Sequence, residues 1–532
     1  MRMVINFGQL LNYYRQAQNS QNFLELFESE ELTLEEVLDR EEELLMELRN
    51  NNSTLLKFFT PERIQTLITY ITQFPSEESS EKAAQKYPYV ASEVFATECS
   101  GLLDNVLTRD SLLKELFEFV DTEEVKDLTL TGYFNKAVTA LLNKNSYELL
   151  SYIYLNSSAA LKMSHHLYSK SIADVLLKIL SNEDQGSPPF LVYLSEILDD
   201  VLGRISSEST AEVCLNSSWL LVELLSLPSD IPTAQEIKAY FLSEKTLEIL
   251  SEKLNTNHET VQKASLSILK ALLVSEENFT EADEQDSSEE SFQKFLEKYL
   301  TSVPEKLEQT PKDSNLETSY KAVITVLGEA RLRHLEILSI LVKLPYKELH
   351  SKVVELGILD KATELFFCYP WNTFLHNTYE NIVQGVLLSN SPELTESFLS
   401  KSKFIQKLIE ASQASQHLGY MGHIAKFGNL ILKYFSVKQI IEYVDIEDWK
   451  SFFNDFLLPQ NEKDARMLGG RLRTESIHCE EMAYGINEPE SSPEVFAAAA
   501  PEEPFEDSET KEFNSNVYWK LEVNLDELED ID

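Results

Sequence analysis

Glycine, proline and cysteine are all scarce in this chain. Its 532 residues include 14 glycines and 17 prolines, below the roughly 7% and 5% of an average protein. Turn-rich all-β folds need more glycine than this, and so do doubly wound folds with phosphate-cradling loops. The four cysteines stand far apart and form no CxxC pair, so the sequence suggests neither a disulfide framework nor a structural zinc site.

Basic residues are scarce relative to acidic ones. The chain has 46 Lys and Arg against 89 Asp and Glu, a net charge of −43. Surfaces that bind duplex nucleic acid or anionic membranes need clustered Lys and Arg, so we expect no nucleic-acid partner. A long apolar run is missing too, because nowhere do 18 apolar residues follow one another. We therefore expect no membrane insertion.

The N-terminal stretch, MRMVINFGQLLNYYRQ, predicts no secretory signal. It has neither an uninterrupted apolar core nor a small-residue cleavage site. Together with the few cysteines, this indicates a reducing compartment. We expect a cytoplasmic protein, with the nucleus as a second location.

The pattern that is present is helical. Leu34, Val37, Leu38, Leu44, Leu45 and Leu48 form one stripe of a predicted helix, and Thr33 with Glu36 fits a capping box at its start. A second stripe follows Ser111. Further helices are predicted near 131–143, 145–155, 170–181, 190–203, 211–226, 234–254, 257–274, 315–343, 346–368, 372–388, 392–400, 402–415, 420–435 and 437–458.

Roughly twenty short helices with almost no strands indicate an all-α fold. Helix pairs this short bury enough apolar surface only by stacking on their neighbours. We predict a HEAT- or armadillo-like α-solenoid over residues 1–460. A compact helical protein of two domains is the alternative.

Two stretches depart from the helical pattern. Residues 276–291 hold eight acids and no base, and they predict a solvated loop between helices. Residues 461–532 lose the apolar rhythm and predict an acidic, mostly disordered tail. Within the tail, apolar and polar residues alternate over 516–528, which predicts a short extended segment. That segment includes Trp519, a candidate partner-binding residue.

No motif of an active site is found. The sequence lacks G-x-x-x-x-G-K-[ST], G-x-G-x-x-G, H-E-x-x-H and G-x-S-x-G. Carboxylates are so frequent that their proximity says nothing about acid–base catalysis. We expect no catalytic residue, cofactor or metal, and the glycines of HLGYMGHIAKFGN are more simply explained by close helix approach.

Two groups of residues are candidate partner contacts. YPWNTFLH (369–376) places Trp371, Asn372 and His376 close together, and Pro370 is predicted to open a helix with Trp371, Phe374 and Leu375 on one face. An aromatic core between helices, with His376 satisfied locally, is the alternative. Arg331 and Arg333 either neutralise nearby acids or hold an acidic partner surface.

Several segments resemble the SAPS-domain family, regulatory subunits of the protein phosphatase 6 class of Ser/Thr phosphatases. The resemblance is carried by the acidic opening at 24–59, KYPYVASEVFATE (86–98), SLLKELFEFVD (111–121), LGEARLRHLEIL (327–338), YPWNTFLH (369–376) and GYMGHIAKFGN (419–429). Trp371, Asn372, His376, Gly422 and His423 match the family pattern. The order of these segments spans about 24–458, although this chain is short for the family.

The resemblance implies a HEAT-like scaffold that binds a phosphatase catalytic subunit and directs it to substrates. The catalytic subunit's own G-D-x-H-G, G-D-x-x-D-R-G and G-N-H-E signatures are absent. We therefore expect a non-catalytic chain, with a protein phosphatase 6-like catalytic subunit and further adaptor subunits as partners. An armadillo-like trafficking or transport adaptor is the alternative, and it predicts a ladder of Asn and Trp in a groove.

Overall fold

The structure is a computed structural model. It describes residues 23–28, 32–74, 82–122, 126–155, 158–182, 191–229, 231–277, 287–311, 315–317, 323–414 and 418–465. The chain divides into two compact units, Met1–Lys352 and Val353–Asp532. This boundary lies inside the single domain that the sequence predicts over 1–460.

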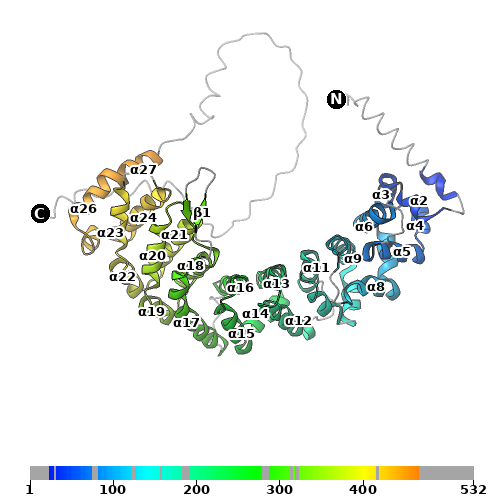
Figure 1. Cartoon of the computed structure of the whole chain (residues 1–532), viewed down its shortest axis with the longest axis horizontal. Helices are drawn as coiled ribbons and strands as arrows, with labels where there is room; N and C mark the ends of the chain where they lie inside the picture. The colour runs from blue at the N-terminus through cyan, green and yellow to red at the C-terminus, as the bar shows by residue number, and fades with distance from the viewer. Residues whose placement is uncertain are drawn as a thin grey trace, which may run out of the picture. The chain divides into compact units, whose positions relative to one another are not determined.

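The first unit is built almost entirely of helices (Figure 1). Thr33 begins α2 with the predicted capping box, and proline occupies the first position of α5 and α14, where its missing N–H costs nothing. The α-helices are α2 (Leu34–Leu38), α3 (Glu41–Arg49), α4 (Ser53–Phe58), α5 (Pro61–Thr72), α6 (Tyr87–Ala96), α7 (Ser100–Leu107), α8 (Asp110–Phe117), α9 (Leu128–Leu155), α10 (Ser158–Ser164), α11 (Lys170–Leu180), α12 (Leu191–Gly203), α13 (Ala211–Leu225), α14 (Pro232–Leu242), α15 (Glu244–Leu254), α16 (Glu259–Glu277), α17 (Ser287–Glu308) and α18 (Glu329–Leu341). The shorter turns are η1 (Leu26–Glu28), η2 (Lys82–Lys86) and η3 (Glu118–Val120).

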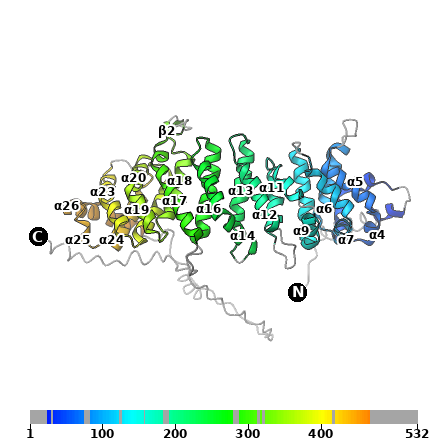
Figure 2. The same cartoon turned by 90° about the horizontal axis from the view of Figure 1, so that it is seen from below.

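These helices stack in two layers. In one layer α6, α9, α11, α13, α16 and α18 each pack against the next. In the other, α8 reaches α10 through η3, and α12, α14 and α17 follow. Figure 2 shows α11, α13 and α16 side by side. This stacking of helix pairs is that of an α-solenoid, so the predicted all-α fold is confirmed.

The second unit continues with helices around an aromatic core. They are α20 (Ile358–Cys368), α21 (Thr373–Leu388), α22 (Pro392–Ser400), α23 (Phe404–Ser412), α24 (Met421–Tyr434), α25 (Val437–Ile440), α26 (Ile446–Ser451), the π-helical turn η4 (Phe452–Leu457) and α27 (Leu458–Asp464), while α19 (Lys347–Glu355) spans the unit boundary. Phe366 stacks on Tyr379 with ring centroids 4.7 Å apart, and Phe427 packs against both rings.

Several predicted helices are divided into shorter elements. The 34–48 stripe breaks at Asp39 and Arg40, between α2 and α3. The 234–254 segment breaks at Ser243, whose hydroxyl caps α15. The 346–368 segment breaks before Gly357, which has a φ of 63°. The 437–458 segment is likewise divided, into α25, α26 and η4.

Two regions differ more from the prediction. The described residues of the first region, 315–317 and 323–328, are not helical. There β1 (Asn315–Glu317) and β2 (Val323–Thr325) form an exposed antiparallel pair, as the β-branched residues of β2 favour. The acidic stretch 276–291 is helical at both ends, where α16 finishes and α17 begins. Its middle, the segment 516–528 and Trp519 lie outside the described residues.

Candidate functional site

The predicted contact residues fall in both units. Arg331 and Arg333 lie in the first, and Trp371, Asn372, His376, Gly422 and His423 in the second. In the part of the chain that the structure describes, no group of three His, Cys, Asp or Glu side chains could hold a metal ion. No described helix is long and apolar enough to cross a membrane.

The turn between α20 and α21 is held by hydrogen bonds to one carbonyl. The Tyr369 carbonyl accepts from the Asn372 N–H at 3.2 Å and contacts the His376 Nε2 at 2.9 Å. His376 is 1% exposed and packs against the rings of Phe366 and Tyr420. Burial lowers the pKa of His376, so its imidazole is neutral at neutral pH. The buried His376 side chain therefore fixes the turn through its contact with the Tyr369 carbonyl.

Two aromatic side chains project from this turn. Trp371 is 66% exposed and Phe374 is 75% exposed, whereas Leu375 is buried. We name Trp371 and Phe374 the aromatic patch. The predicted helix start at Pro370 is wrong: α21 begins at Thr373, because the Asn372 side chain caps it by accepting the Leu375 N–H at 3.0 Å.

Gly419 has no side chain and so leaves room for Trp371 of the aromatic patch to pack closely against it. A Cβ at this position would lie 2.5 Å from the Pro370 carbonyl oxygen and 2.9 Å from the Trp371 Cε3. The indole thus packs directly on the backbone of the loop that precedes α24. Gly428 likewise permits close helix approach, since its Cβ would meet Phe452 and Leu457. Gly422 is exposed, with open space around its Cβ position.

A group of charged and polar side chains connects α21 with α24. Glu380 of α21 contacts the Nδ1 of His423 at 3.1 Å and pairs with the ammonium of Lys426. Burial alone would raise the pKa of the Glu380 carboxyl, but these two hydrogen bonds outweigh it and hold the pKa below its usual value. The group ties α24 to α21 beside the turn.

The two candidate arginines have different surroundings. Arg331 is buried, and its guanidinium donates to the carbonyls of Leu327 and Val326 at the start of α18. Arg333 is partly exposed and pairs with Glu329 and Glu336 of its own helix. Internal neutralisation of acids thus describes Arg333, but its guanidinium also lines a surface groove.

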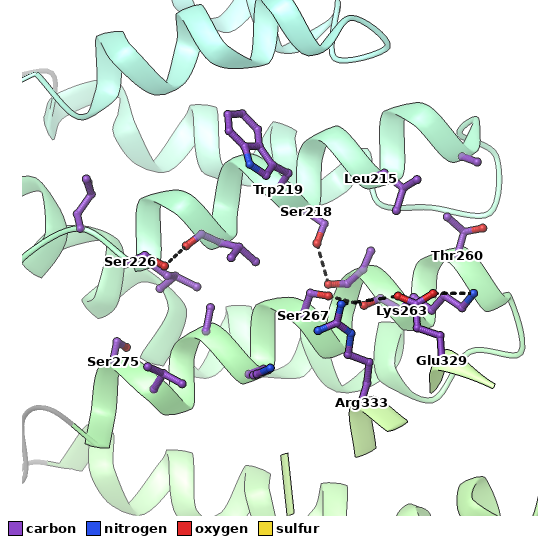
Figure 3. A pocket seen from close by; sticks show the side chains of 18 of the residues that line it. Leu215, Ser218, Trp219, Ser226, Thr260, Lys263, Ser267, Ser275, Glu329 and Arg333 are labelled. Atoms are coloured by element: carbon purple, nitrogen blue, oxygen red, sulfur yellow. Dashed lines mark hydrogen bonds and ion pairs between the residues drawn. The ribbon is translucent and has the colours of Figure 1, made fainter. Parts of the chain in front are cut away.

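This groove runs along α13 and α16 and has a volume of about 1030 Å³. Figure 3 shows Arg333 extending from α18 toward Ser267, while Trp219 projects from α13 on the other side. Lys170 of α11 lies over the Trp219 ring, and burial lowers the pKa of Lys170 to about 8. Trp219 is the one tryptophan among the residues that line the groove, and no asparagine lines it.

The sequence pattern missed several of these residues. Phe374 was expected on a face shared with the buried Leu375, and Gly419 was noted without its contact to Trp371. Glu380 was hidden among many acids. Its link to His423 and Lys426 depends on the packing of α21 against α24, for which the sequence carries no local signal.

The chain matches a family of phosphatase-associated proteins. The family described as SIT4 phosphatase-associated protein, SAPS, matches residues 138–355 and 348–466. Serine/threonine-protein phosphatase 6 regulatory subunit 3 of Gallus gallus is 23% identical over 456 residues, covering 76% of this chain and 52% of that protein. Regulatory subunit 2 of Mus musculus is 21% identical, covering 82% and 56%. Regulatory subunit 1 of Homo sapiens is 22% identical, covering 82% and 57%.

The chain spans about half the length of the curated relatives it matches. The relatives are named regulatory subunits rather than catalytic ones, in agreement with the expectation of a non-catalytic chain. The matched residues include the aromatic patch, the Glu380 group and the groove.

Proposed function

This chain belongs to the SAPS family, and from that premise we propose that it is a non-catalytic regulatory subunit. Its partner is a protein phosphatase 6-like Ser/Thr phosphatase catalytic subunit, which supplies the metal site and the chemistry. The chain directs that subunit to substrates by holding both on a helical scaffold. The names of the relatives support the class of partner.

The aromatic patch is the surface we assign to the catalytic subunit. Trp371 and Phe374 stand exposed on a turn that is fixed by the Asn372 cap, the His376 contact and Gly419. Rigid aromatic side chains are frequent hot spots of protein interfaces, because they bury a large area and lose little conformational entropy. This exposed, held pair is the observation that carries the assignment.

Measurement of the affinity between the full chain and a purified protein phosphatase 6-like catalytic subunit tests the proposal. Trp371→Ala is expected to weaken binding by about 2–4 kcal/mol, or roughly 30- to 1000-fold. Phe374→Ala is expected to act in the same direction. Leu388→Ala is the matched control, since Leu388 is an exposed apolar residue at the other end of α21.

The outcomes separate two claims. If the intact chain does not bind the catalytic subunit, the regulatory role is wrong. If the chain binds but Trp371→Ala binds as tightly as Leu388→Ala, the role stands and the assignment to the aromatic patch is wrong. A trafficking adaptor is not favoured, because the described residues that line the groove of the first unit include one tryptophan and no asparagine, instead of the ladder of Asn and Trp which that function predicts.

A further inference from the structure

The groove on the first unit has the spacing of a helix-binding surface. Helices α13 and α16 pack side by side and line it over their lengths. Trp219 of α13 and Lys263, Lys270 and Ser275 of α16 also line the groove. Five other lining residues along each helix recur at intervals of four and three, the spacing with which coiled-coil helices receive a neighbour. They are Ala211, Leu215, Ser218, Val222 and Leu225 on α13, and Thr260, Ala264, Ser267, Ala271 and Val274 on α16.

Small side chains form the floor of the groove and leave space above it. Ala264, Ser267 and Ala271 follow one another along α16, and the Ser218 hydroxyl of α13 donates to the Ala264 carbonyl at 3.0 Å. Leu215, 54% exposed, and Val274, 42% exposed, stand at opposite ends. The lined span of about 15 residues is about 22 Å long, which matches a helix of four turns.

Other contacts in the same layer are crossed by polar side chains. Between α9 and α11, Asn135 donates to Asp174 at 2.9 Å and Lys178 to Thr139 at 3.1 Å. Between α16 and α18, Lys270 pairs with Glu336 at 2.9 Å. The floor of the groove between α13 and α16 is instead made by apolar and hydroxyl side chains, and Lys263 and Lys270 lie on one wall.

The charges on one wall indicate the character of the occupant. Lys263, Lys270 and Arg333 line the groove with a single acid, Glu329, although the whole chain carries −43. These bases also pair with Glu259, Glu329 and Glu336, of which Glu259 and Glu329 are largely exposed to solvent. Water screens the pairs with Glu259 and Glu329 strongly, whereas Lys270 and Arg333 share the single carboxylate of Glu336. This wall therefore retains a preference for an incoming carboxylate.

We propose that this groove binds an amphipathic helix of about 15 residues from a partner protein other than the phosphatase catalytic subunit. The apolar face of that helix, with large residues at intervals of three and four, lies on α13 and α16. An acidic flank faces Lys263, Lys270 and Arg333. Recognition follows the helix-in-groove mode, in which apolar anchors give affinity and flanking charges fix orientation.

Two synthetic peptides probe the site directly. Both are labelled 18-residue helices with leucines at intervals of three and four, and one flank carries glutamates in the first and lysines in the second. Fluorescence anisotropy with the full chain measures both affinities. The glutamate peptide is expected to bind at least 10-fold more tightly, and Arg333→Gln is expected to reduce that ratio.

Variants at the exposed ends test the location. Leu215→Asp and Val274→Asp are each expected to weaken binding of the glutamate peptide at least 10-fold. Their side chains are already partly in solvent, so the fold tolerates the change. Leu128→Asp on α9 is the control, because Leu128 is an exposed leucine of the same unit, and it is expected to leave binding unchanged.

Several results would overturn the proposal. These are absence of saturable binding, equal affinity for the two peptides, and equal effects of Leu215→Asp and Leu128→Asp. A dimer of the chain that Leu215→Asp dissociates would mean that the occupant is a second copy. If Leu215→Asp abolishes binding of the catalytic subunit while Trp371→Ala does not, the groove serves the phosphatase instead.

Discussion

Gly419 and Gly422 lie three residues apart, yet alanine should have opposite effects at the two positions. An alanine Cβ at 419 would lie 2.5 Å from the Pro370 carbonyl oxygen and 2.9 Å from the Trp371 ring. At 422 it would meet open space. Neither glycine has a positive φ, so the difference between the two substitutions measures space rather than backbone strain.

The size of the effect follows from which atoms must move. Ordinary van der Waals contact begins near 3.4 Å, so the Pro370 carbonyl has to withdraw by about an ångström. The neighbouring Tyr369 carbonyl is bonded to Asn372 and contacts His376, and this limits the movement. Gly419→Ala should therefore destabilise the chain by about 1–3 kcal/mol. Gly422→Ala should stabilise α24 by about 0.5 kcal/mol.

Urea unfolding followed by circular dichroism gives the two changes in free energy. Acrylamide quenching of tryptophan fluorescence reports on the Trp371 indole, and subtraction of the signal of a Trp371→Phe variant isolates it. We expect Gly419→Ala to increase quenching and Gly422→Ala to leave it unchanged. Equal stabilities of the two variants, with unchanged quenching in both, would refute the close contact of Gly419 with the aromatic patch.

Three further predictions concern capping and titration. Asn372→Ala should destabilise the chain by about 1 kcal/mol in urea unfolding through loss of the α21 cap, while Asn372→Asp should retain most of that stability. Burial lowers the pKa of His334 to about 4 from 6.5. As pH falls, His334 is therefore protonated in the unfolded chain at a higher pH than in the folded chain. The free energy of unfolding should fall by about 3 kcal/mol as pH drops from 6.5 to 4. His334→Gln should remove that slope from a series of urea midpoints. The lowered pKa of Glu380 contributes stability that is present above its usual 4.5 and is lost as pH falls through the native value. Glu380→Gln should abolish this acid-induced loss, and an unchanged slope below pH 4.5 would contradict the pairing.

Helices were predictable where one apolar stripe recurs with a period of 3.6, and their ends were not. The break predicted near residue 144 is present, because Asn145 leaves helical geometry within α9. The break at Ser243 was missed, since one serine both ends α14 and caps α15. Helix α17 was missed although Phe292, Phe295, Leu296 and Tyr299 mark a buried stripe, because it begins within the acidic stretch.

The residues of the candidate site could be predicted from the sequence, but not which of them are exposed to solvent. YPWNTFLH contains two competing helix starts, Pro370 and Asn372. If proline opened the helix, Trp371 would lie on the same face as Leu375 in the core. Because asparagine caps the helix instead, Trp371 lies in the turn and faces solvent. The sequence cannot decide between these starts, since the decision depends on the contacts of His376 and Gly419 with neighbouring helices.

The aromatic patch and the groove depend on the same physical device. In stacked helices, large apolar residues on facing surfaces normally bury one another, so an exposed apolar surface needs a reason to persist. At the aromatic patch, Gly419 lets the indole rest on backbone rather than enter the core. In the groove, Ala264 and Ala271 leave a low floor below Leu215 and Val274. A larger side chain on the floor of the groove would bury more apolar area and stabilise the chain. It would also fill the space in which we propose that the partner helix binds. Stability and binding therefore oppose each other at these small residues.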